Sequence, residues 1–188
     1  MIIFDLDGTL ANCEHRRHFV EKPERCESPY KCCICKKCEQ FNEWQPNWSA
    51  FYEACDLDKP IYPSWFIFNG VAQWTNIEIW SGRCESVRDK TINWLMNKCP
   101  LKPTYWNKES WNRVLKMRPI GDNTPDNVLK ERWLMEQCDG MNLDCKTRLP
   151  TADSYDIDFV FDSHPASIAM WRRRGIFVFN CAQKDGEF

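Results

Sequence analysis

The sequence predicts an α/β fold in which helices flank a mostly parallel β-sheet. Residues 1–5, 77–80 and 157–161 are short apolar runs that end at polar residues, and the second and third runs lead into helical patterns. Alternation of strands and helices is typical of parallel sheets, whose ligand sites lie beyond the carboxyl ends of the strands. The length of 188 residues suits one domain, and a hydrophobic content of 43% is sufficient for a buried core.

The first expected strand covers residues 1–5 and ends in Asp5. The turn-forming pair Asp7-Gly8 follows, and Gly8 permits a tight turn whose backbone N–H groups can face an anion. Asp5 and Asp7 stand two residues apart, so one carboxylate can attack while the other transfers protons. Hard oxygen ligands also suit Mg²⁺, which neutralises charge in phosphoryl transfer.

Residues 13–48 depart from the α/β pattern, because they contain several prolines and little hydrophobic periodicity. We expect them to form an insert, while residues 1–12 and 49–188 form the core. Aromatic side chains near the end of the insert are candidates for stacking on a nucleobase. These side chains are Trp44, Trp48 and Phe51.

The insert contains a cluster of cysteines. The chain has twelve cysteines, and five of them fall between positions 26 and 38. Because the insert is too small and polar to build its own core, we expect a structural Zn²⁺ with four ligands to fold it. The candidate ligands are Cys26, Cys32, Cys35 and Cys38. Cys33, His15 and His18 are alternative ligands, and reduced thiols in a loop are the alternative to a metal site.

The second expected unit is the strand at 77–80, followed by the loop Ser81-Gly82-Arg83 and by a helix between Glu85 and Asn97. A further helix is expected to begin near Pro125 and to carry Lys130.

The third unit begins with the strand at 157–161, which is followed by Asp162. A helix is expected from Pro165 to Arg174, with Gly175 as its stop, and a strand is expected at 176–179. Asp5, Ser81 and Asp162 each follow a strand, so we expect them at one edge of the sheet.

Charge and hydropathy exclude several classes of protein. The formal charge is −2, so no overall positive field attracts nucleic acid, and contact with a polyanion requires a local patch. The N-terminus lacks the basic region of a secretory signal, and no apolar run approaches the roughly 20 residues that span a bilayer. We therefore expect a cytoplasmic protein without membrane contact.

The run Asp5-Leu6-Asp7-Gly8-Thr9-Leu10 resembles the first motif of the haloacid dehalogenase (HAD) superfamily of phosphatases. Further stretches resemble the 3′-phosphatase domain of phage polynucleotide kinase. These are Ser81-Gly82-Arg83, Met117-Arg118-Pro119 through Lys130-Glu131, Phe161-Asp162, Met170-Trp171-Arg172-Arg173 and the closing Gly186-Glu187-Phe188. The Gly-x-x-x-x-Gly-Lys-Ser/Thr loop of a kinase is absent, so only the phosphatase half is represented. A phage-encoded protein would act in the cytoplasm of its host.

The resemblance implies a HAD-like Rossmannoid core, with the insert as a small cap that selects substrates. It implies Asp5 as the nucleophile that forms an aspartyl-phosphate and Asp7 as the general acid and base. Asp5, the main-chain carbonyl of Asp7 and Asp162 would hold Mg²⁺.

The resemblance also implies a set of groups that bind the substrate. Ser81 and Lys130 would bind the transferring phosphoryl oxygens. The other implied substrate contacts are Gly8, Thr9, Gly82 and the guanidinium groups of Arg16, Arg83 and Arg118.

One position departs from the family pattern. The family usually has two acids at the end of the fourth strand, whereas this chain reads Asp162-Ser163-His164. Loss of the second acid predicts a lower metal affinity, and we still expect activity because the other motif residues are intact.

Three functions remain open at this point. The first is a polynucleotide 3′-phosphatase that acts on DNA or RNA ends in nucleic-acid repair. The second is a phosphatase of free nucleotides, which the nearly neutral charge favours. The third is an inactive zinc-containing module that binds nucleic acid.

Overall fold

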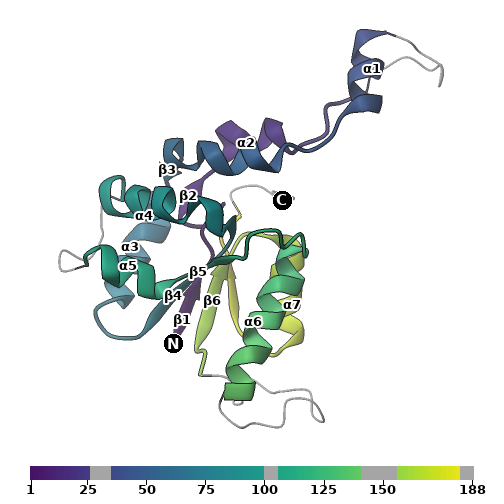
Figure 1. Ribbon diagram of the computed structural model, residues 1–188. Coiled ribbons are helices and arrows are strands. Elements are labelled where there is room, and N and C mark those ends of the chain that lie inside the picture. The colour runs from purple at the N-terminus through teal and green to yellow at the C-terminus, as the bar shows by residue number, and fades with distance from the viewer. Residues whose placement is uncertain (26–34, 100–105, 141–155, 183–188) are drawn as a thin grey trace.

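A five-stranded parallel sheet forms the centre of the computed structural model, which describes residues 1–25, 35–99, 106–140 and 156–182. The strand order is β5-β4-β1-β6-β7 (Figure 1). The strands are β1 (Ile2–Phe4), β4 (Ile77–Cys84), β5 (Leu115–Arg118), β6 (Phe159–Asp162) and β7 (Val178–Asn180). All four pairings are parallel, so the predicted α/β class is confirmed.

Helices cover both faces of the sheet (Figure 1). One face is covered by α3 (Tyr62–Val71), α4 (Arg88–Asn97) and α5 (Lys108–Val114), and the other by α6 (Asp126–Gly140) and α7 (Pro165–Arg173). The predicted helix at 165–174 is confirmed, and Gly175 ends it with a φ of 74° that favours glycine. No helix in the described ranges has both the length and the apolar character that a membrane span requires.

Alternating side chains of the strands divide the core into two layers. Ile2 and Phe4 face the layer under α3, α4 and α5, whereas Ile3 faces the layer under α6 and α7. Each layer is rich in tryptophan: Trp65 lies in the first and Trp171 in the second, both with 0% exposure. Burial of a large apolar side chain contributes about 1.5–3 kcal/mol, so these layers fix the sheet and its carboxyl edge.

The segment between β1 and α3 lies beyond the sheet. Its described residues form a small antiparallel pair, two 3₁₀ helices and two short α-helices. These are β2 (Ala11–Asn12), η1 (Glu14–Phe19), α1 (Lys36–Glu43), α2 (Trp48–Glu53), η2 (Ala54–Leu57) and β3 (Lys59–Pro60). Figure 1 shows α1 far from the sheet, while α2 lies close to the rest of the molecule.

Two of the four predicted zinc ligands lie outside the described residues. Cys26, Cys32 and the alternative Cys33 lie in the range 26–34, which the structure does not describe. Cys35 is exposed and Cys38 is buried. Within the described ranges, no group of three or more His, Cys, Asp or Glu side chains is arranged to hold a metal ion.

One detail of the predicted sheet is wrong. The stretch Ser81-Gly82-Arg83 is not a loop, because β4 continues through it to Cys84 with a shift in its register against β5. A register shift of this kind interrupts the regular alternation of side chains between the two faces. Such irregularities are common next to active sites. The predicted helix at 85–97 is confirmed: α4 ends at Asn97 as expected and is preceded by a 3₁₀ turn, η3 (Glu85–Val87).

Candidate active site

Three neighbouring strands bring the predicted acids and serine to one edge. Asp5 directly follows β1, Ser81 lies in β4 and Asp162 is the last residue of β6. Because β4, β1 and β6 are adjacent and parallel, their carboxyl ends meet. The backbone N–H of Asp5 donates to the carbonyl of Phe161 at 2.8 Å, which ties the first acid to β6.

The ammonium group of Lys130 joins three of the acids. Its Nζ donates to Asp5 Oδ1 at 2.8 Å and to Asp162 Oδ2 at 3.0 Å, and it lies 2.9 Å from Asp126 Oδ2. The exposed fraction of the Lys130 side chain is 1%. Lys130 comes from the second turn of α6, so this helix holds a cation over the ends of β1 and β6.

These contacts shift the pKa values of the nucleophile candidate and its partner. Burial raises the pKa of Asp5 well above its usual value, and the charges of Asp162 and Asp126 add to this effect while Lys130 opposes it. Burial alone would lower the pKa of Lys130, but the three carboxylates outweigh it and raise that pKa well above its usual value. Lys130 is therefore a permanent positive charge beside Asp5.

Two buried arginines hold Asp7. Arg16 Nη2 donates to Asp7 Oδ1 at 2.6 Å, and Arg83 Nε donates to the same oxygen at 2.9 Å. Both guanidinium groups also bind Asp58, whose side chain is fully buried: Arg16 Nε donates to its Oδ1 at 2.8 Å, and Arg83 Nη2 donates to its Oδ2. His15 Nε2 lies 2.9 Å from Asp58 Oδ1. Two acids and two guanidinium groups thus form one network.

The network keeps Asp7 ionised. Burial would raise the pKa of Asp7, but the charges and hydrogen bonds of Arg16 and Arg83 outweigh burial and lower that pKa below its usual value. The pKa values of Asp5 and Asp7 are thus shifted in opposite directions by their surroundings. Carboxylates whose pKa values are separated in this way are typical of acid and base pairs in active sites.

The other predicted substrate contacts lie around the same edge. Gly8 has a φ of 80°, which favours glycine, and Thr9 Oγ1 donates to Asp5 Oδ2 at 3.3 Å. The hydroxyl oxygen of Ser81 accepts a hydrogen bond from the Arg83 backbone N–H at 3.2 Å. The chain therefore brings these residues together as the sequence led us to expect.

Arg118 has a different set of partners from the other two arginines. Its Nε donates to the carbonyl of Gly82 at 2.8 Å, and its Nη1 donates to the carbonyl of Thr124. Its Nη2 lies 3.6 Å from Asp126 Oδ1. Arg118 thus links β4, β5 and the start of α6 through main-chain groups.

Gly82 leaves space that Asp126 fills. A Cβ atom on residue 82 would lie 2.4 Å from Asp126 Oδ1. This oxygen is buried and accepts no hydrogen bond from the described residues. Close packing of Gly82 and Asp126 fixes the carboxylate that contacts Lys130.

The donor set suits a small hard cation. Asp5 and Asp162 are both within hydrogen-bonding distance of one ammonium group, so their carboxylates are adjacent. Ser163, which stands where the family has an acid, donates through Oγ to the main-chain carbonyl of Asp7 at 3.1 Å. Carboxylate and carbonyl oxygens are the ligands that Mg²⁺ prefers, so these residues fit that ion.

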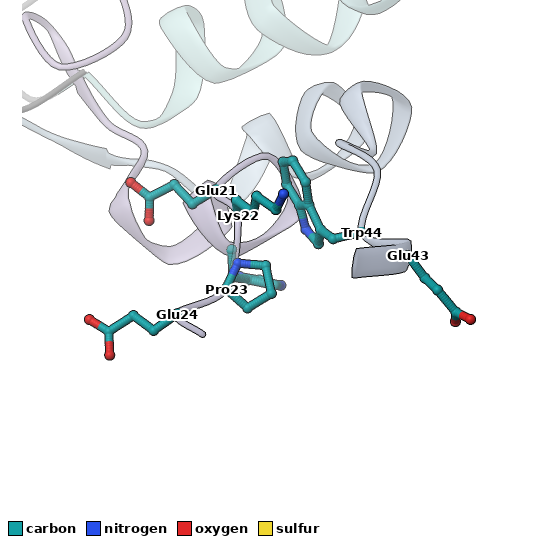
Figure 2. A pocket seen from close by; sticks show the side chains of 7 residues that line it. Glu21, Lys22, Pro23, Glu24, Glu43 and Trp44 are labelled. Atoms are coloured by element: carbon teal, nitrogen blue, oxygen red, sulfur yellow. The ribbon is translucent and has the colours of Figure 1, made fainter. Parts of the chain in front are cut away.

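A separate cavity of about 630 Å³ lies at the base of the insert (Figure 2). Its lining residues are His18, Glu21, Lys22, Pro23, Glu24, Glu43 and Trp44. None of the side chains of the edge described above lines this cavity. It therefore has no part in the candidate active site.

Two residues of the site were not predicted from the sequence. Asp126 lies four positions before Lys130 on α6, and this i,i+4 spacing of opposite charges is a signal that the sequence carries. Asp58 offers no such signal, because its partner Arg16 is 42 positions away.

Comparisons with known proteins match this architecture. Residues 50–188 match the family model described as the polynucleotide kinase PNKP phosphatase domain. The matched range includes Ser81, Lys130 and Asp162, and it begins after Asp5 and Asp7. No curated protein sequence matches the chain.

Structural comparison matches two solved structures to the chain. A structure of the Pnkp1/Rnl/Hen1 complex contains a chain that is 20% identical, with a TM-score of 0.57 over 95% of this chain and 44% of that one. The present chain thus spans less than half the length of that relative. A HAD-family enzyme from Bacteroides thetaiotaomicron in a magnesium complex is 11% identical, with a TM-score of 0.45 over 99% of this chain and 95% of that one.

The family model covers most of the chain, and the parallel sheet places the matched residues at one edge. The chain therefore belongs to the HAD family described as the polynucleotide kinase PNKP phosphatase domain.

Proposed function

We propose that this protein is a Mg²⁺-dependent phosphatase that removes 3′-phosphate from DNA or RNA ends through an aspartyl-phosphate on Asp5. One observation carries the proposal most directly: Asp5 and Asp7 stand on the same turn in opposite electrostatic surroundings. Asp5 lies against Lys130 with a raised pKa, and Asp7 lies between two arginines with a lowered pKa. Attack on phosphorus requires the ionised form of Asp5, which the charge of Lys130 favours, and hydrolysis of the phosphoenzyme requires a base, which suits ionised Asp7.

Asp5 acts as the nucleophile in this proposal. An oxygen of its carboxylate attacks phosphorus, the bond to the sugar oxygen breaks, and the phosphoryl group moves to Asp5. Lys130, held 2.8 Å from Asp5 Oδ1, offsets the negative charge that gathers on the phosphoryl oxygens. Ser81, which is fully buried beside this edge, donates a hydrogen bond from its hydroxyl group to one of those oxygens.

Asp7 acts as the general acid and base in this proposal. It takes up a proton from solvent before the first step, donates that proton to the leaving sugar oxygen, and afterwards takes one from the water that hydrolyses the phosphoenzyme. Ionised Asp7 has the protonation state of the base that the second step needs. Arg16 and Arg83 orient its carboxylate, and Asp58 in turn orients both arginines.

Asp5, Asp162 and the main-chain carbonyl of Asp7 would hold Mg²⁺, which when bound supplies positive charge beside the phosphoryl oxygens. The hydrogen bond from Ser163 to the Asp7 carbonyl supports this set, because it holds the carbonyl in place without adding a charge. We expect weaker metal binding than a second acid would give.

Family membership supports the choice of a nucleic-acid end as substrate, because the matching family is named for polynucleotide kinase. The formal charge of −2 supports free nucleotides as the second candidate, since long polyanions gain little from the overall field.

Phosphate release tests this proposal. A 3′-phosphorylated oligonucleotide and free 3′- and 5′-mononucleotides are compared with and without Mg²⁺, with Asp5→Asn as the control. We expect preference for the oligonucleotide and no turnover by the control. Preference for mononucleotides would replace the proposal with a nucleotidase, and binding without turnover of any substrate would point to an inactive module.

The zinc-bound cap is a separate proposal. We propose that Cys26, Cys32, Cys35 and Cys38 bind one structural Zn²⁺, because the last three form two overlapping Cys-x-x-Cys spacings, 32–35 and 35–38. Metal analysis of the purified chain is expected to give one zinc per chain, and an undetectable zinc content would refute this.

A further inference from the structure

Trp48 is an exception among the tryptophans of this chain. Five of the ten tryptophans are among the largest fully buried side chains, whereas Trp48 is 50% exposed. In the described part of the chain, only Trp74, at 88%, is more exposed. Trp74 precedes β4 and lies at the amino edge of the sheet, opposite the candidate active site.

The helix that carries Trp48 is fixed to the active site by two hydrogen bonds. Phe51 in α2 accepts a hydrogen bond through its carbonyl from Arg16 Nη1 at 3.1 Å. Tyr52, the next residue, donates its hydroxyl to the carbonyl of Gly82 at 3.3 Å. The position of α2 is therefore set by Arg16, which also holds Asp7, and by Gly82, which lies beside Ser81.

The side chains of α2 divide into a buried and an exposed set. Phe51 is only 4% exposed and lies under the guanidinium group of Arg16, whose Cζ is 4.1 Å from its ring centroid. It therefore has no free face for a ligand. Tyr52 and Trp48 stack with ring centroids 5.9 Å apart and an interplanar angle of 30°.

Tyr52 connects this aromatic pair to the phosphate-binding groups. Its partner Gly82 lies between Ser81 and Arg83, and the same Gly82 carbonyl accepts from Arg118. Trp48 is one helical turn before Tyr52, so the exposed indole lies one side chain further from the site. A nucleotide has this sequence of parts: a phosphate, then a sugar, then a flat base.

We propose that Trp48, supported by Tyr52, is the stacking platform for the terminal nucleobase of the substrate. The inference rests on the proposed function and adds a specificity residue to it. It also separates the three aromatic candidates of the sequence: Trp48 contacts the base, Phe51 supports Arg16, and Trp44 lines the separate cavity at the base of the insert. Stacking tolerates any base, so little preference among the four bases is expected.

The test compares substrates that differ only in the terminal base. Initial rates are measured for a 3′-phosphorylated oligonucleotide, for the same strand with an abasic terminal residue, and for glycerol 2-phosphate. Loss of a stacked base costs about 5- to 150-fold in affinity. We therefore expect Trp48→Ala to raise KM at least about five-fold for the strand with the base.

On the abasic strand, Trp48→Ala and the unaltered chain are expected to have the same KM, because no base remains to be lost. Trp48→Phe keeps an aromatic face and is expected to recover most of the affinity. Trp74→Ala, which removes an exposed tryptophan at the opposite edge, is the matched control and is expected to change nothing. An equal loss on both strands would mean that Trp48 only supports the fold, which overturns the inference.

Equilibrium binding separates this inference from the proposed function. The dissociation constant of a labelled 3′-phosphorylated oligonucleotide is measured for Asp5→Asn with and without Trp48→Ala. Weaker binding of the double variant supports the platform even if the unaltered chain releases no phosphate, which would refute the proposed function alone. Equal binding by both variants, or no binding by either, overturns the platform.

Discussion

Gly82 is the position at which one added methyl group should reach the reacting carboxylates. A Cβ at residue 82 would lie 2.4 Å from Asp126 Oδ1 and 3.2 Å from Asp126 Cγ. Ordinary van der Waals contact begins near 3.4 Å, so the carboxylate must retreat by about 1 Å. The backbone at Gly82 is outside the left-handed region, so this contact is the only strain that alanine adds.

The displacement should pass to the nucleophile through Lys130. Asp126 Oδ2 lies 2.9 Å from Lys130 Nζ, which in turn donates to Asp5 Oδ1 at 2.8 Å. A misplacement of about 1 Å in an active site can cost about 100-fold in rate. We therefore expect Gly82→Ala to lower kcat about 100-fold.

The assay pairs initial rates of phosphate release with thermal unfolding. Overpacking costs about 1–3 kcal/mol, which lowers Tm by about 2–4 °C per kcal/mol for a chain of this size, so the variant stays folded at 25 °C. Gly70→Ala is the matched control, because Gly70 is an exposed helical glycine in α3 whose added Cβ would meet nothing within 4 Å. It should keep full activity and gain about 0.5–1 kcal/mol. Full activity of Gly82→Ala would refute the reasoning.

Three further predictions concern the acids of the site. Asp58→Asn should lower the free energy of unfolding in urea by about 3–5 kcal/mol, because it leaves the charges of Arg16 and Arg83 only partly paired, and it should reduce kcat/KM in the phosphate assay. An unchanged unfolding midpoint would contradict this. Asp5→Asn should raise Tm at pH 7 while abolishing turnover, because the raised pKa of Asp5 means that its buried charge costs stability; a lower Tm would count against that reading. Asp7 has a lowered pKa in the fold, so its contribution to stability is complete above the unfolded pKa near about 4 and is lost as the pH falls through the folded pKa. Urea unfolding below about pH 5 should therefore depend less on pH in Asp7→Asn, and identical pH profiles would refute this.

The strands and helices that could be predicted have strong local patterns. Ile2, Ile3 and Phe4 form a continuous apolar run, as expected for a strand with helices on both faces. β5 was not predicted, because Leu115–Arg118 is short, lies at the sheet edge and includes a lysine. The ammonium group of Lys116 lies 5.1 Å from the ring centroid of Trp80, a contact that only the folded sheet creates.

The residues of the candidate site also divide into those with a local sequence pattern and those placed by tertiary packing. Asp5, Asp7 and Asp162 stand in a short motif or at the end of an apolar strand, so their chemistry could be inferred from the sequence. Asp58 and Phe51 belong to the site because the chain between β1 and β4 folds back onto Arg16, with separations of 42 and 35 positions. Local patterns carry no information about such pairings, which depend on tertiary packing.

Trapping the phosphoenzyme tests the central claim most directly. The Asp7→Asn chain is mixed with Mg²⁺ and [³²P]4-nitrophenyl phosphate, whose leaving group departs without a proton from Asp7; it is then quenched in acid after a short time, digested and analysed by mass spectrometry. The account predicts a hydroxylamine-sensitive label on the peptide that contains Asp5, because Asp7 no longer activates the water that removes it. Labelling of a different residue, or rapid phosphate release by the unaltered chain with no trappable label in either chain, would contradict the account.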